Sequence, residues 1–302
     1  MNTKSNSLSS EMLAKRANGL EPKVHIKIVG LIKEQDFHFA KSIIEGLKQK
    51  FPREFADPEI CPLLEFDWHA YVDGQKRELR GEVWQFSSGV MCFVDEQFIG
   101  DSGALAAWAQ DQWAFTCEQP HASCVDEYYL KHLRATKHRF VFMDIEIGEE
   151  PVGRLLFELF SDVCPRTSWN FEALCTGERG QATGGYPLWY KGSLFHRVVP
   201  NGWVQGGDIN PARKGNGGEA IYGETFDGTP RGTLGMANKG PHSNGSQFYI
   251  TLQPTRWMDL TYVAFGQVVE GVDVLKRIEE APTTNQRPKK ECTVVNCGVF
   301  KL

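Results

Sequence analysis

FHRVVPNGWVQGGD, residues 195–208, is the most informative stretch of the sequence. Two apolar runs flank a Pro-Asn-Gly turn, and two glycines end the second run, a pattern that predicts two short buried strands joined by a tight turn. Arg197 and Gln205 interrupt these apolar runs. A guanidinium keeps its charge and carries five donors, so among apolar residues it needs a partner or a substrate. Gln205 is a candidate neighbour for it.

A second stretch, residues 234–250, reads LGMANKGPHSNGSQFYI and follows the same plan. It predicts a strand, a glycine-rich polar loop and another strand. Trp257, Met258 and Asp259 come next. The apolar segment YVAFG at residues 262–266 then predicts a further strand.

Three motifs in this half of the chain point to a known family. FHRVVPNGWVQGGD, MANKGPHSNGSQFYI and VAFGQVVEG resemble, in this order, the cyclophilin family of peptidyl-prolyl cis-trans isomerases. The resemblance runs from about Arg139 to Leu302, over half of the chain. It implies a closed antiparallel β-barrel with two capping helices, which we place at residues 138–302. Many short strands and two helices fit that architecture independently, because closure leaves no open sheet edge.

The composition argues against several classes of function. A net charge of −5 and a pI near 5.9 give no reason to expect nucleic-acid binding. No apolar run approaches the roughly 18 residues of a membrane span, and the first residues lack the apolar core of a secretion signal. The eight cysteines include no CxxC pair. We therefore expect reduced thiols and a cytoplasmic or nuclear protein that is not secreted.

The first part of the chain predicts a smaller α/β domain. Its strand, helix, strand, hairpin and helix lie at residues 24–30, 37–47, 63–72, 90–100 and 103–113. The first three elements form a βαβ unit, which indicates parallel strands, and Asp101 or Ser102 is placed to cap the last helix. This order resembles a thioredoxin or glutaredoxin fold. The boundaries that follow are 1–20 for a flexible leader, 21–115 for this thioredoxin-like domain and 116–137 for a linker.

The redox chemistry of that fold does not carry over to this sequence. The active cysteines would follow the first strand, where the chain has GLIK at residues 30–33. Cys92 alternates within a predicted strand, which favours a small buried hydrophobe. Cys117, His121 and Cys124 fall short of a four-ligand zinc set, so we interpret their segment as an ordinary linker and predict no metal and no cofactor. The domain is interpreted as a docking module for a protein assembly.

The chemistry of an isomerase of this type requires no nucleophile. Resonance gives the peptide C–N bond a rotational barrier of about 18–20 kcal/mol. Twisting the bond localises a lone pair on the proline nitrogen, and a fixed donor aimed at that atom stabilises the transition state over the ground state. The resemblance implies that Arg197 is this donor and that Gln205 holds or assists it. It implies that the remaining substrate-facing residues are Gly215, Ala237, Asn238, Gln247 and Trp257, the last also a contact for cyclosporin-type ligands.

The proline pocket departs from the family pattern. The family builds this pocket from Phe, Met, Phe and Leu, closes it with His and keeps a small residue after the loop asparagine. The same positions here are Gly202, Trp203, Tyr249, Met258, Tyr262 and Lys239. Losing an aromatic wall weakens binding of the proline ring unless another group fills the space.

Two hypotheses about function follow: an isomerase of proline-containing client segments that acts through Arg197, or a weak or inactive proline-binding scaffold within a larger assembly. A redox protein is the third and least favoured.

Overall fold

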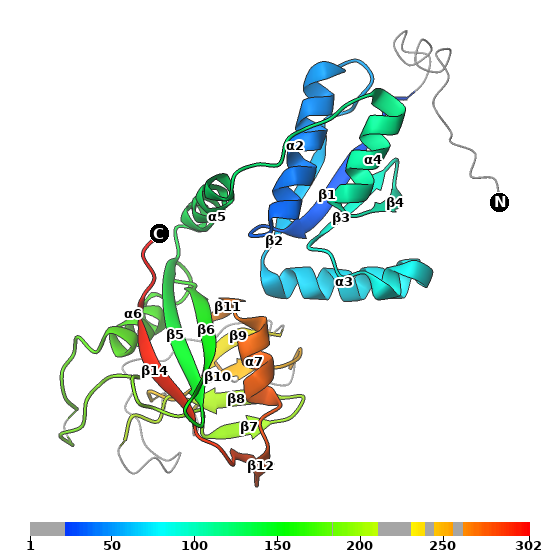
Figure 1. The fold of residues 1–302 in the computed structure, drawn as a ribbon. Helices are drawn as coiled ribbons and strands as arrows, with labels where there is room; N and C mark the ends of the chain where they lie inside the picture. The colour runs from blue at the N-terminus through cyan, green and yellow to red at the C-terminus, as the bar shows by residue number, and fades with distance from the viewer. Residues whose placement is uncertain (1–21, 183, 211–230, 239–244, 256–261) are drawn as a thin grey trace. The chain divides into compact units, whose positions relative to one another are not determined.

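A computed structural model describes residues 22–182, 184–210, 231–238, 245–255 and 262–302. The chain divides into two compact units, Met1–His132 and Leu133–Leu302 (Figure 1). No helix in the described ranges has both the length and the apolar character that crossing a membrane requires.

The N-terminal unit is a four-stranded mixed sheet with helices on both faces. The strands run in the order β2-β1-β3-β4, with β1 parallel to β2 and antiparallel to β3. The predicted hairpin is confirmed as β3–β4, and a βαβ unit is present, but its second strand lies ahead of the predicted residues 63–72. The elements are β1 Ile26–Leu31, α2 Gln35–Lys50, β2 Glu59–Leu63, α3 Glu65–Leu79, the 3-10 helix η1 Gly81–Gln85, β3 Val90–Val94, β4 Gln97–Gly100 and α4 Ser102–Trp113. The next helix, α5 Ala122–Thr136, contains the boundary between the two units.

Alternating side chains divide this unit into two hydrophobic cores. Ile28 and Cys92 point to the core that contains α2 and α4, whereas Val29, Met91 and Phe93 point to the core that contains α3. This is the period of two expected for a strand covered on both faces. Figure 1 shows α2 and α4 side by side over the sheet and α3 apart from them.

The prediction of a strand at residues 63–72 is wrong. The strand β2 ends at Leu63 and the helix α3 begins at Glu65. The apolar residues that suggested alternation also contain a four-residue spacing, because the two buried side chains of α3 are Trp68 and Val72. Acidic side chains in the first turn and basic ones in the last turn complement the helix dipole, which favours the helix.

The predicted cap of α4 is confirmed. Asp101 Oδ1 accepts a hydrogen bond from the backbone N–H of Ala104 at 3.0 Å. The hairpin before it turns at Asp95 and Glu96, whose φ angles of 46° and 67° are those of a tight two-residue turn. The segment predicted as a linker contains the helix α5.

The C-terminal unit is a curled eight-stranded antiparallel sheet with helices. The strand order is β14-β5-β6-β11-β9-β10-β8-β7. The elements are β5 Arg139–Ile147, β6 Glu150–Leu159, α6 Pro165–Thr176, β7 Arg197–Val199, β8 Trp203–Gly206, β9 Thr233–Met236, β10 Phe248–Thr251, β11 Ala264–Glu270, α7 Val272–Glu279, β12 Thr283–Thr284, β13 Arg287–Pro288 and β14 Cys292–Val299.

The two edges of this sheet approach each other. An isolated antiparallel bridge joins Leu194, just before β7, to Thr293 in β14, and the N–H of Phe195 donates to the carbonyl of Cys292 at 2.9 Å. Inside the curl, Phe171 of α6 packs edge-on against Phe248 of β10, with ring centroids 5.2 Å apart. The sheet therefore wraps an aromatic core, and β7 and β8 are held at its rim.

Candidate functional site

The hairpin β7–β8 sets the position of Arg197. Arg197 lies directly opposite Gln205 in the antiparallel register, so both side chains project from the same face of the sheet. The connecting turn contains Asn201 with a φ of 56°. Asparagine tolerates this left-handed conformation better than most residues, which explains its place after Pro200.

Arg197 is exposed and its guanidinium has two neighbours. Its Nε donates to Oε1 of Gln286 at 2.7 Å, and its guanidinium carbon lies 5.3 Å from the ring centroid of Trp203. Gln286 occupies the tip of the hairpin β12–β13, and its backbone carbonyl accepts the N–H of Val198 at 2.7 Å. The support expected from Gln205 thus comes from Gln286, which the sequence analysis missed because no motif marks it.

Gln205 instead connects two strands through the amide of Gln247. Its Nε2 donates to Oε1 of Gln247 at 2.9 Å, and its own Oε1 lies 3.5 Å from Nε1 of Trp203. The backbone carbonyl of Gln247 accepts the N–H of Ala237 at 2.9 Å, and Asn238 follows directly. The structure therefore brings together five of the predicted residues, Trp203, Gln205, Ala237, Asn238 and Gln247, beside Arg197.

The aromatic residues of the predicted proline pocket pack against each other. Tyr249 is only 1% exposed, and its ring meets that of Tyr262 edge-on at 5.7 Å. It pairs with Gly235 on β9, where an added Cβ would lie 2.3 Å from the Tyr249 hydroxyl oxygen. A glycine is required there because the phenol lies over its Cα. Little of the Tyr249 ring is left for a ligand to contact.

Gly202 is buried, and the atoms around it leave little room for a side chain. An added Cβ would lie 3.1 Å from Cγ1 of Val199, closer than most such contacts. An aromatic wall at this position would require Val199 to shift. Four further predicted residues lie outside the described residues: Gly215, Lys239, Trp257 and Met258.

Comparison with known proteins identifies the family. The model of the cyclophilin type peptidyl-prolyl cis-trans isomerase/CLD family matches residues 142–299, more than half of the chain. This chain belongs to the cyclophilins. Three similar proteins are each named "Probable inactive peptidyl-prolyl cis-trans isomerase-like 6". The one from Bos taurus is 51% identical over 92% of this chain and 94% of its own. The one from Homo sapiens is 49% identical over 92% of each chain, and the one from Mus musculus 50% identical over 93% of this chain and 92% of its own.

His196 precedes Arg197 in the chain, and the positive charge of that arginine is one of the causes that lower the pKa of its imidazole. Burial lowers the pKa of the imidazole, and Asp208 offsets part of that effect. Its Nδ1 is buried and has no hydrogen-bond partner among the described residues. A neutral histidine is therefore favoured, as expected for a packed structural residue.

Cys61 and Cys92, the two cysteines on the strands of the N-terminal unit, lack the lowered thiol pKa of a redox centre. Cys92 is fully buried, and that burial raises the pKa of its thiol far above its usual value. Burial, followed by a hydrogen bond to Glu59, also raises the pKa of Cys61. The interpretation of Cys92 as a buried hydrophobe is confirmed. Within the described ranges, no three His, Cys, Asp or Glu side chains gather to hold a metal ion.

Proposed function

We propose that this cyclophilin binds X–Pro segments of client proteins on the face that carries Arg197, Gln205 and Gln247, and that it accelerates their isomerisation weakly at most. The observation that supports this most is the contrast between Arg197 and Tyr249. The guanidinium of Arg197 is exposed and held in place, whereas the aromatic ring of Tyr249 is buried against Gly235. The names of the three relatives, each called probably inactive, agree with low activity.

Arg197 can perform the chemistry that isomerisation requires. A guanidinium is charged at every physiological pH, so it can always donate to the nitrogen of a twisted amide. The bond to Gln286 and the contact with Trp203 hold the group in advance, which reduces the entropy lost when a substrate binds.

The pocket is the weaker half of the machinery. Selective stabilisation of the twisted amide depends on holding the proline ring still while the preceding residue rotates. Gly202 supplies no wall, and Tyr249 and Tyr262 contact each other. We therefore expect weak binding of the proline ring and a small rate enhancement. Trp203 is the residue placed to replace the missing wall, and Gly215, Lys239, Trp257 and Met258 belong to the same proposed site.

The proposal is tested with purified protein and a panel of X–Pro peptides. NMR exchange spectroscopy measures cis–trans interconversion even when turnover is slow, and amide shifts of Ala237 and Gln247 report binding. We expect saturable shifts and an exchange rate at most slightly above the blank. Arg197→Ala is expected to abolish any acceleration. Peptides that leave these amides unshifted at millimolar concentration contradict the proposal, and efficient turnover contradicts its second half.

A second candidate function, docking to an assembly, is supported by the surface of the N-terminal unit. Trp84 of η1 is 61% exposed, and Leu79 at the end of α3 is 40% exposed. Exposed aromatic side chains are typical anchors of protein interfaces. A scaffold of this kind would retain its partners in Arg197→Ala and lose them in Trp84→Ala. The opposite pattern, recovered from cells with tagged full-length protein, favours the isomerase.

We further propose that residues 138–302 form a fully closed barrel, that residues 21–115 have a thioredoxin-like fold and that residues 116–137 are a linker. We also propose that the protein resides in the cytoplasm or nucleus and binds cyclosporin-type ligands through Trp257. The bridge between Leu194 and Thr293 supports closure of the barrel. The mixed sheet between helices supports the thioredoxin-like fold.

A further inference from the structure

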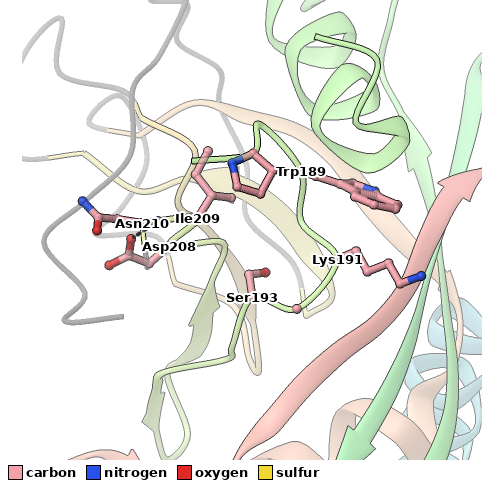
Figure 2. A pocket seen from close by; sticks show the side chains of 8 residues that line it. Trp189, Lys191, Ser193, Asp208, Ile209 and Asn210 are labelled. Atoms are coloured by element: carbon pink, nitrogen blue, oxygen red, sulfur yellow. Dashed lines mark hydrogen bonds between the residues drawn. The ribbon is translucent and has the colours of Figure 1, made fainter. Parts of the chain in front are cut away.

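A small cavity opens in the C-terminal unit beside the segment that follows β8. Its volume is about 210 Å³, smaller than the roughly 300–1,000 Å³ of pockets that bind drug-sized molecules. It fits the end of one side chain. Figure 2 shows the lining residues Trp189, Lys191, Ser193, Asp208, Ile209 and Asn210. None of these belongs to the proposed X–Pro face.

Ser193 is the feature of this cavity that the fold leaves unexplained. The side chain is 5% exposed, and its hydroxyl has no hydrogen-bond partner in the described part of the chain. Its backbone is fully used, because its N–H donates to Tyr190 and its carbonyl accepts from Val294. A buried hydroxyl without a partner destabilises the fold, so a ligand that bonds to it recovers that loss.

The charge of the cavity is supplied by Asp208. This side chain is 4% exposed and accepts the backbone N–H of Asn210 at 3.0 Å. The ammonium of Lys191 lies 5.2 Å from the ring centroid of Trp189, and Figure 2 shows it directed away from Asp208. A carboxylate, a hydroxyl and an amide therefore surround the space, with an apolar wall at Ile209.

We propose that this cavity binds the guanidinium of an arginine side chain in a partner protein. A guanidinium offers five donors in one plane, which suits a set of acceptors placed around Asp208, and its weakly hydrated faces suit the apolar wall. A lysine ammonium is a compact and more strongly hydrated charge, so it should bind less well. The site goes beyond the X–Pro face and does not depend on it.

The test is an NMR titration of the full-length protein at pH 7.5, where the neighbouring His196 is neutral because burial lowers its pKa. The probes are N-acetyl-arginine methylamide and the same blocked form of citrulline, its uncharged isostere. We expect saturable shifts of the Ser193 and Asn210 amides in the millimolar range with arginine and none with citrulline. Equal responses to both probes, or no response, overturn the proposal. Tighter binding of free arginine than of the blocked form overturns its assignment to a protein side chain.

Two variants separate binding from folding. Asp208→Asn should weaken arginine binding at least about tenfold, because hydrogen bonds to a charged acceptor are stronger than those to a neutral one. Ser193→Ala should weaken binding severalfold and leave Tm unchanged or higher. The matched control is Ser246→Ala, which removes a bond from a buried hydroxyl to the carbonyl of Gly207 at 2.6 Å and should lower Tm. Ser193→Ala with unaltered arginine binding contradicts the proposed role of its hydroxyl. X–Pro binding should be the same in both cavity variants.

Discussion

Arg197 and Gln286 are separated by 89 positions in the sequence, yet they form the central hydrogen bond of the candidate site. The register of the hairpin β7–β8 placed Arg197 opposite Gln205, and this much follows from the Pro-Asn-Gly turn. The partner that holds the guanidinium comes from a separate hairpin. Nothing in the local sequence of that hairpin specifies where its tip will lie, because its position depends on the whole sheet.

Removing Gln286 should weaken X–Pro binding without unfolding the domain. Gln286→Ala releases the guanidinium of Arg197, which then loses part of its binding energy to conformational entropy. A hydrogen bond to a charged group stabilises by about 1.5–3 kcal/mol when buried, and less at this exposed position, so we expect a three- to tenfold loss of affinity. NMR titration with an X–Pro peptide measures it. Thr284→Ala on the same hairpin is the control, and equal affinities for both variants would contradict this role.

His196 should make the domain sensitive to mild acid. Burial lowers its pKa in the folded state, while the unfolded value is about 6.5. Between these two pKa values the unfolded chain binds more protons than the folded chain. The free energy of unfolding is therefore highest above about pH 6.5 and decreases as the pH falls from there through the folded pKa. Urea unfolding from pH 7.5 to 5 should show this decrease, and His196→Gln should reduce its slope. An unchanged slope in the variant would assign the acid sensitivity to other groups.

At the scale of elements, the sequence indicates most strands and helices but not every one. The helix α2 lies where the apolar spacing of residues 37–47 predicts it, and the strands β3 and β4 lie where two apolar runs flank a turn. The strand prediction for residues 63–72 is wrong because a short amphipathic segment can satisfy both the strand period of two and the helix period of 3.6. Only the packing of the segment decides between the two structures. On α3, Trp68 and Val72 are the buried pair.

The cap of α4 is the element whose sequence signal is easiest to test. Asp101→Ala removes the bond to the N–H of Ala104 and should reduce the free energy of unfolding by about 1 kcal/mol, within a usual range of 0.5–2. Asp101→Ser should recover most of the loss. Asp111→Ala, on the exposed side of the same helix, is the matched control. Urea unfolding monitored by circular dichroism measures all three, and a loss shared by Asp111→Ala would point to charge and not to capping.

At the scale of the molecule, the sequence predicts far more about the C-terminal unit than about the N-terminal unit. The C-terminal unit carries three long motifs, which predicted its family, its sheet and most of the candidate site. The N-terminal unit carries only element order and the absence of redox cysteines, so its fold resemblance and its docking role stay predictions. Pocket residues such as Tyr249 fall between these cases, because the sequence gives their identity while the contact with Gly235 appears only in the structure.

The last prediction concerns the independence of the two units. Phe37 is fully buried in the core of the N-terminal unit, so Phe37→Ala should remove about 3–5 kcal/mol from the stability of that unit. Because each unit has its own core, X–Pro binding at Arg197 should persist at temperatures where the N-terminal unit of this variant has melted. Calorimetry of the full chain should show one transition shifted down and the other unmoved. Glu45→Ala, which removes only an exposed pair with Lys41, should move neither by more than about 1 kcal/mol. A single shared transition that shifts as a whole would show instead that the cyclophilin domain depends on its N-terminal unit for stability.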